Sequence, residues 1–165
     1  MQHELLAVVD EHDVIIDHRP RHEIHAQGLR HRAVHILVFN EHDQLLLQKR
    51  SLKKDLNQGL WDTSAAGHVD QGEDYDSCAP RELQEELNVN ASLTPLFKLE
   101  PTPGLGMEFV QVYRCQHNGP FQFATEEIDE IGWFDLADID QRVQQDDQTL
   151  TQTFKIIWRR LQQIS

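Results

Sequence analysis

Short apolar segments separated by polar turns run through most of the chain, and this pattern predicts β-strands. The first two segments flank a polar turn at residues 10–13 and predict a hairpin near the amino terminus. The segment at residues 33–39 is apolar enough to predict a central strand of a larger sheet. The predicted strands cover residues 4–9, 14–17, 33–39, 44–50, 93–100, 107–116 and 130–136.

Helical spacing of apolar residues occurs in the middle of the chain and at its end. The segment at residues 18–31 is polar and predicts an irregular or short helical stretch, and residues 51–64 predict a loop. The predicted helices cover residues 77–87, 137–145 and 150–163. The apolar stripe of the last helix indicates core packing and consists of Phe154, Ile157, Trp158 and Leu161.

The helix at residues 77–87 carries signals at both ends. If Ser77 is the N-cap, Pro80 falls at the third helical position, where its missing N–H costs no intrahelical bond. Asn88 follows the last helical residue and predicts an end in the left-handed conformation.

The chain has 165 residues and predicts a single domain over residues 1–165, with an N-terminal hairpin extension at about residues 1–29. The net charge of −13 repels phosphates, so we expect no nucleic-acid partner. Cys78 and Cys115 form no CxxC motif, and no apolar stretch is long enough to span a membrane. We therefore expect a cytoplasmic protein without a membrane partner.

Carboxylates crowd the helix at residues 77–87. Glu82, Glu85 and Glu86 are related as i, i+3 and i+4, so they share a helix face on which like charges repel. Leu83 and Leu87 point to a different face that can pack on a sheet. Oxygen ligands at this density are typical of a hard divalent cation, so Mg²⁺, or alternatively Mn²⁺, is the predicted cofactor.

Residues 67–89 resemble the Nudix box, GX5EX7REUXEEXGU, in which U is apolar. Gly67, Glu73, the Arg81-Glu82 pair and the Glu85-Glu86 pair all stand at the required spacing. The one departure is Asn88 in place of the last glycine, which lies at the helix end and affects no ligand. The order of the flanking strands and helices also fits this family.

The resemblance implies an α/β fold of the Nudix type, an α/β/α sandwich with a mixed sheet. It further implies Mg²⁺-dependent hydrolysis of a diphosphate that is linked to another group. The site residues that it implies are the metal ligands Glu82, Glu85 and Glu86, the carbonyl of Gly67 as a further ligand, and a supporting ion pair between Arg81 and Glu73.

The general base of the reaction could come from outside this motif. Glu127 and Glu130 precede a predicted strand that often lies near the site in the family, so either could bind a metal or accept a proton. A role as solvated surface charge is an equal alternative for both.

Residues 29–68 also resemble isopentenyl diphosphate isomerase, which shares the fold. The matching residues are Arg50, Lys54, Trp61, Gly67 and His68, and His31 stands where that enzyme has a metal-binding histidine. The isomerase needs a cysteine directly before the Gly-His pair to move a proton at carbon, and Ala66 is found here. This departure and the complete glutamate set favour a hydrolase from an isomerase-like branch of the family.

Two groups of residues are candidates to bind the substrate. Arg50, Lys53 and Lys54 form a basic cluster that could hold a diphosphate, with a solvated loop as the alternative. Trp61 could stack on an aromatic ring of the substrate, or it could pack in the core.

The histidines permit a transition-metal site. His18, His22 and His25 have suitable spacings, and His31 and His35 would share a strand face. Scattered histidines are more often surface or core residues, so this remains the minor interpretation.

The sequence thus predicts a metal-dependent hydrolase that cleaves the pyrophosphate bond of a nucleoside diphosphate linked to another moiety, or of a related organic diphosphate. The alternatives are an isomerase acting on five-carbon diphosphates and a non-catalytic module that binds a nucleotide. A small-molecule diphosphate is the expected partner, and a homodimer is one option for the oligomeric state.

Overall fold

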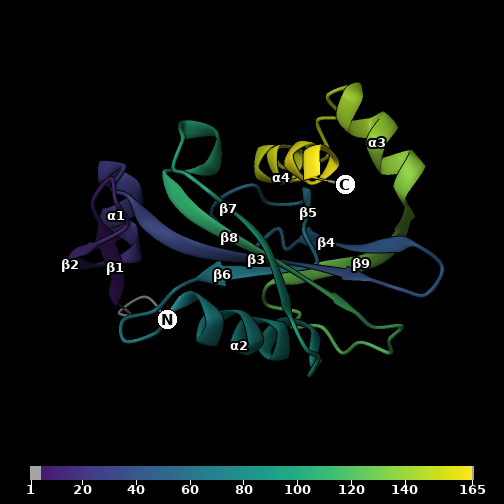
Figure 1. Ribbon diagram of the computed structural model, residues 1–165, viewed down its shortest axis with the longest axis horizontal. Helices are drawn as coiled ribbons and strands as arrows, with labels where there is room; N and C mark the ends of the chain where they lie inside the picture. The colour runs from purple at the N-terminus through teal and green to yellow at the C-terminus, as the bar shows by residue number, and fades with distance from the viewer. Residues whose placement is uncertain (1–4, 165) are drawn as a thin grey trace.

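Apolar strands form the centre of the molecule, as the computed structural model shows for residues 5–164, the part of the chain that it describes (Figure 1). The strands are β1 (Leu5–Val9), β2 (Ile15–Pro20), β3 (His31–Phe39), β4 (Gln44–Arg50), β5 (Trp61–Asp62), β6 (Ala65–His68), β7 (Thr94–Leu99), β8 (Glu108–Gln116) and β9 (Ile128–Asp135). The helices are α1 (Arg21–Gln27), α2 (Tyr75–Leu87), α3 (Leu136–Gln144) and α4 (Gln152–Ile164), with a 3-10 turn η1 at Pro103–Leu105.

The main sheet has seven strands and is mixed. β3 lies parallel to β8 and antiparallel to β4 and β6, while β9 pairs with β4 and β7 pairs with β8, both antiparallel. β3 is buried along nearly all of its length, as expected for a central strand that is covered on both faces. The predictions of a mixed sheet and of a central strand at residues 33–39 are confirmed.

Helices cover both faces of this sheet. Leu83 and Leu87 of α2 pack against one face in a buried apolar cluster. Phe154 and Ile157 of α4, together with Ile139 of α3, form a second cluster on the other face. Figure 1 shows α2 and α4 on opposite sides of the sheet, which confirms the α/β/α sandwich. Among the described residues, no helix is both long enough and apolar enough to cross a membrane.

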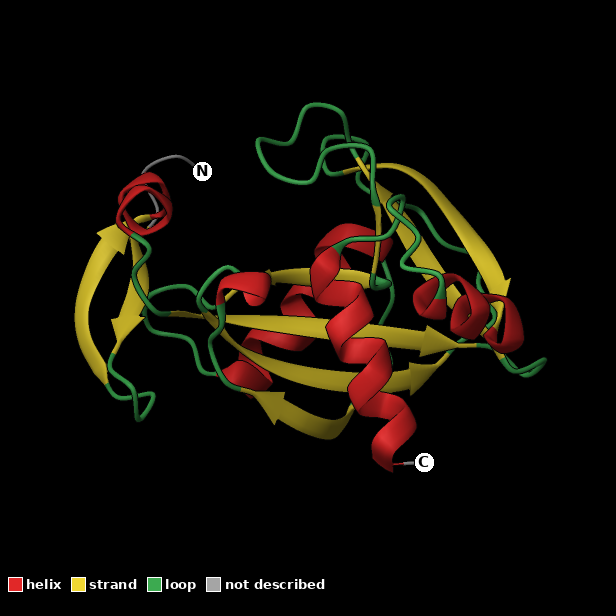
Figure 2. Cartoon of the chain, turned by 90° about the horizontal axis from the view of Figure 1, so that it is seen from above, coloured by secondary structure: helices red, strands yellow, loops and turns green. Residues whose placement is uncertain are grey.

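The N-terminal hairpin and α1 form a small unit at one end of the sheet (Figure 2). β1 and β2 pair antiparallel as predicted, and residue 4 of the expected first strand lies outside the described part of the chain. Leu6, Val8 and Ile24 form a cluster of their own within this unit. The predicted short helical stretch at residues 18–31 corresponds to α1, which ends at Gly28 in a left-handed conformation.

Residues 51–64 are not entirely a loop, because β5 begins at Trp61 and pairs with β4. β6 follows and pairs with β3, although no strand was predicted there. Neither strand has the apolar alternation that marks a strand in the sequence. Both form because β4 and β3 offer them unpaired backbone groups.

The start of α2 differs from the prediction that Ser77 is its N-cap. The N-cap is Asp74, whose carboxylate accepts a hydrogen bond from the Ser77 N–H at 2.8 Å, while the Ser77 hydroxyl lies 3.2 Å from the Asp74 N–H. This reciprocal capping box stabilises an earlier start. Pro80 therefore lies inside the helix, where it donates no bond to the carbonyl of Asp76. The predicted left-handed end at Asn88 is confirmed, with φ of 55°.

Candidate active site

A large cavity lies beside α2 and is bordered by segments far apart in the sequence. Its volume is about 1010 Å³. It is bounded by β6, α2, α1, the loop after β4, and η1. The lining includes the acidic residues Glu82, Glu85, Glu86, Glu108 and Glu127 and the basic residues Arg21, Arg50, Lys54 and Arg81.

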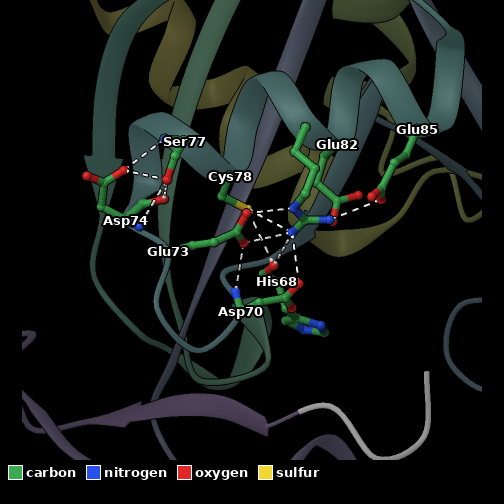
Figure 3. Close-up of polar contacts among 9 residues, drawn as sticks. His68, Asp70, Glu73, Asp74, Ser77, Cys78, Glu82 and Glu85 are labelled. Carbon is green, nitrogen blue, oxygen red and sulfur yellow. Dashed lines mark hydrogen bonds and ion pairs between the residues drawn. The ribbon is translucent and has the colours of Figure 1, made fainter.

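Arg81 and Glu73 form the ion pair that the box resemblance implied. The Arg81 Nε and Nη2 atoms donate to the two Glu73 oxygens at 2.6 and 2.8 Å. These hydrogen bonds hold the pKa of Glu73 below its usual value. The same guanidinium reaches Glu82 and Glu85 through Nη1, at 3.0 Å from each (Figure 3). Arg81 therefore connects the loop before α2 to the carboxylates on the helix.

The three helix carboxylates differ in their environments. Glu85 is exposed, with 57% of its side chain accessible, whereas Glu82 and Glu86 are nearly enclosed. Burial raises the pKa of Glu82 and of Glu86, and the charge of Glu82 adds to the rise at Glu86. A cation between them would offset both effects. The donor set, three carboxylates on the lining of one cavity, fits Mg²⁺ or Mn²⁺.

Gly67 lies directly against one of these carboxylates. A Cβ atom on Gly67 would stand 2.1 Å from the Glu82 carboxyl carbon and 2.2 Å from its Oε1 atom, far inside any tolerated contact. The absence of a side chain therefore lets Glu82 approach β6. The glycine lines the cavity beside Glu82, where its carbonyl was predicted to add a metal ligand.

The predicted substrate residues lie in two places. Arg50 and Lys54 line the cavity, and Lys54 forms an ion pair with Glu127, the candidate base. Glu130 is absent from the lining, on β9 opposite Lys49. Trp61 is also absent from the lining, since its ring packs edge-on against Phe134 with centroids 5.1 Å apart. This contact favours the packing alternative for Trp61.

A histidine cluster lies beside α1, which contributes His25 to it. The predicted histidine sets included His25 and His31 separately but did not bring them together. Ligand atoms of His25, His31 and His68 all lie within 4.8 Å of one another. Glu108 joins them, with its Oε2 at 3.4 Å from His31 Nε2 and 3.0 Å from His68 Nε2. This arrangement has the ligand types of a transition-metal site.

Two members of the histidine cluster, Glu108 and His25, have shifted pKa values. Burial acts to raise the pKa of Glu108, but the adjacent rings of His31 and His68 outweigh it and hold that pKa well below its usual value. Burial, together with the neighbouring His68, lowers the pKa of His25 to about 4. His25 is therefore neutral at pH 7, the form in which an imidazole binds a metal.

Two site residues went unnoticed in the sequence. Glu108 comes from the start of β8, and Gln48 from the middle of β4, where its amide donates to Glu86 Oε1 at 2.8 Å. Its position directly after the apolar run Leu45, Leu46 and Leu47 is the one sequence signal for Gln48. Nothing in the local pattern distinguishes Glu108 from the other acidic residues of the chain.

Comparison with known proteins identifies the family of the chain. Residues 29–154 match the family model of the NUDIX domain. An isopentenyl-diphosphate Delta-isomerase of Serratia proteamaculans is 32% identical over 163 residues, covering 96% of this chain and 91% of the relative. An uncharacterized Nudix hydrolase of Pseudomonas aeruginosa is 37% identical over 131 residues, covering 77% of this chain and 76% of the relative. The crystal structure of a Deinococcus radiodurans protein aligns with a TM-score of 0.84 and 27% identity, over 95% of this chain and 98% of that one.

Proposed function

The chain belongs to the Nudix family, and from this premise we propose that it is a Mg²⁺-dependent enzyme acting on a nucleoside diphosphate linked to another moiety, or on a related organic diphosphate. Hydrolysis of a pyrophosphate bond is the general activity, which follows from the family and from relatives that are Nudix hydrolases. The metal requirement and the class of substrate are the proposal.

The observation that carries the proposal is the position of Glu82, Glu85 and Glu86 together on the lining of one large cavity. These carboxylates would hold Mg²⁺, with the carbonyl of Gly67 as a further ligand. Mg²⁺ bound there would neutralise charge on the diphosphate and lower the pKa of a bound water. Arg81, held by Glu73, would keep the helix carboxylates in place.

Basic residues supply the other requirement of a diphosphate site. Arg50 and Lys54 border the same cavity and can pair with phosphate oxygens. Lys54 is paired with Glu127, so a bound phosphate would compete with that carboxylate for the ammonium group. A Glu127 side chain released in this way could accept a proton from the attacking water.

A second candidate function is an isomerase reaction on five-carbon diphosphates. The histidine cluster of His25, His31 and His68 with Glu108 favours it, since His31 and His68 match the pattern of that enzyme. Ala66 weighs against it, because a methyl side chain cannot move a proton at carbon. Hydrolysis therefore stays the leading proposal.

We also propose that residues 1–165 form one Nudix domain with an extension at about residues 1–29, since the family match starts at residue 29. The net charge of −13 supports a small-molecule partner rather than nucleic acid. We further propose a cytoplasmic enzyme without a membrane partner, which the two free cysteines support.

The test is a substrate panel with the purified protein and Mg²⁺. We expect phosphate-containing products from at least one linked diphosphate, and we expect Glu85→Gln and Glu86→Gln to lower kcat/KM by at least about 100-fold, the usual loss when a charge-stabilising group is removed. Glu41→Gln, at an exposed turn, is the matched control and should keep full activity.

Two outcomes would contradict the proposal. Undiminished hydrolysis in both variants would remove the helix carboxylates from the mechanism. Deuterium uptake at carbon by a five-carbon diphosphate in D₂O, without release of phosphate, would favour the isomerase instead.

A further inference from the structure

Gln48 is a buried polar residue that neither the family motif nor the cavity lining includes. It lies on β4 with only 4% of its surface exposed, and it follows the apolar run Leu45, Leu46 and Leu47. A buried amide costs free energy unless its hydrogen bonds are made. Its contacts therefore indicate what this residue does for the molecule.

Both N–H groups of the Gln48 amide have partners. Nε2 donates to Glu86 Oε1 at 2.8 Å and to the carbonyl of Ser64 at 3.1 Å. Two acceptors for the two N–H groups fix the plane of the amide. The glutamine thus joins a loop next to β6 with a carboxylate of α2, two segments that are far apart in the sequence.

The Ser64 end of this connection is rigid. The Ser64 hydroxyl accepts from the Val38 N–H at 2.8 Å and donates to the Leu46 carbonyl at 2.5 Å. Ser64 is fully buried, and it links β3 to β4 where the two strands share only one backbone pair. A hydrogen-bonded chain therefore runs from the sheet through Ser64 and Gln48 to Glu86.

Glu86 needs such support because a carboxylate rotates easily about its last side-chain bond. The Ala66 N–H lies 3.4 Å from both carboxylate oxygens and so does not distinguish between them. Gln48 donates to Oε1 alone, so it fixes the rotation of the Glu86 carboxylate. The direction in which Oε2 points is then fixed as well. A neutral amide achieves this without adding a charge to the cluster, as lysine or glutamate would at this position.

We propose that Gln48 is a positioning residue that orients Glu86 for metal binding. This inference rests on the proposed function, since it assumes that Glu86 is a Mg²⁺ ligand. Groups that hydrogen-bond to metal ligands typically contribute about 10–100-fold to metal affinity or activity. Gln48 acts only through Glu86, so its loss should be visible first in the Mg²⁺ requirement of the enzyme.

The experiment compares Gln48→Met with Gln111→Met. Methionine has nearly the length of glutamine and no donor, and Gln111 is a partly buried strand glutamine that donates to the Phe97 carbonyl. We expect Gln48→Met to weaken Mg²⁺ binding in calorimetry by about 10–100-fold and to raise the Mg²⁺ concentration for half-maximal activity equally. Gln111→Met should leave both unchanged, and excess Mg²⁺ should restore the kcat of Gln48→Met. Mg²⁺ is chosen because it prefers carboxylates to imidazoles.

The outcomes separate this inference from the proposed function. Wild-type protein that neither binds Mg²⁺ nor hydrolyses the panel overturns the proposed function and this inference with it. Active wild-type protein with the same Mg²⁺ affinity in Gln48→Met and Gln111→Met overturns this inference alone, as does lost activity that excess Mg²⁺ fails to restore. If Gln48→Met does not fold, Gln48→Asn is measured by the same criteria, because its shorter amide cannot reach both acceptors.

Discussion

Single atoms decide the geometry of the carboxylate cluster, and Gly67 gives the sharpest case. The Cβ of an alanine at this position would overlap the carboxyl group of Glu82. Because that group is the far end of a flexible side chain, it can swing aside and the fold can survive. We expect Gly67→Ala to keep a near wild-type melting temperature and to lose Mg²⁺ binding, as measured by calorimetry.

Gly132→Ala is the matched control for this substitution. Gly132 also lies in a strand, and its nearest neighbour to an added Cβ is a Phe134 ring atom at 3.5 Å, an ordinary contact. It should bind Mg²⁺ as the wild type does. Retained Mg²⁺ affinity in Gly67→Ala would mean that Glu82 is not a ligand, or that it binds equally well from a displaced position.

The site residues that the sequence predicts are those fixed by local spacing. Glu82, Glu85 and Glu86 follow from a helical period, and they do lie on the cavity lining. Gln48 and Glu108 could not be predicted, because their partners are set by tertiary contacts. Gln48 and Glu86 are 38 positions apart in the chain, and only the packing of α2 on the sheet brings them together.

At the scale of elements, the N-cap of α2 stabilises the start of the helix that carries the three carboxylates. The Asp74 side chain caps the Ser77 N–H at 2.8 Å, and loss of such a cap costs about 1 kcal/mol. We expect Asp74→Ala to lower the melting temperature by about 2–4 °C, the usual size for about 1 kcal/mol in a chain of this length. Thermal denaturation of both proteins, with and without Mg²⁺, measures this difference in melting temperature.

Asp74→Asn keeps an acceptor oxygen at the same position, so it should retain most of the stability. A cap-specific effect therefore appears as a gap between the two variants. Equal losses in Asp74→Ala and Asp74→Asn would mean that the charge of Asp74, rather than its hydrogen bond, stabilises the helix end.

The errors made at this scale have a common physical origin. A proline near a helix start predicts a late N-cap, but the capping box of Asp74 and Ser77 outweighs the one bond that Pro80 cannot make. β5 and β6 are short and partly polar, and pairing with neighbouring strands stabilises them rather than their own propensity. Long periodic elements such as α4 were predicted to within a few residues.

At the scale of the whole molecule, the N-terminal unit completes the cavity of the family domain. Arg21 and His25 of α1 both line that cavity. Arg21 also forms a two-bond ion pair with Asp55 in the loop after β4, at 3.0 and 3.1 Å. The unit has its own small apolar cluster, so its attachment to the domain depends partly on these polar contacts.

The contact of His25 with His68 makes the attachment of the N-terminal unit to the domain sensitive to acid. Burial beside His68, Arg21 and His31 lowers the pKa of His25 from 6.5 to about 4, with Glu108 opposing the change. Between pH 6.5 and pH 4, His25 binds a proton in the unfolded chain but not in the folded chain. The stability that is fully present above pH 6.5 therefore falls as the pH drops toward 4. For a half-buried ring we expect a loss of about 1–2 kcal/mol, after allowance for solvent screening.

Replacing His25 by glutamine removes the group that titrates and should reduce this sensitivity. The melting temperature of the wild type should fall between pH 7 and pH 4.5 by several degrees more than that of His25→Gln. His12→Gln, at the exposed hairpin turn, is the matched control and should behave as the wild type does. If all three proteins lose the same stability, acid acts on another group such as the buried His35, whose pKa is also lowered by burial. The neutral ring of His25 would then not hold the N-terminal unit in place.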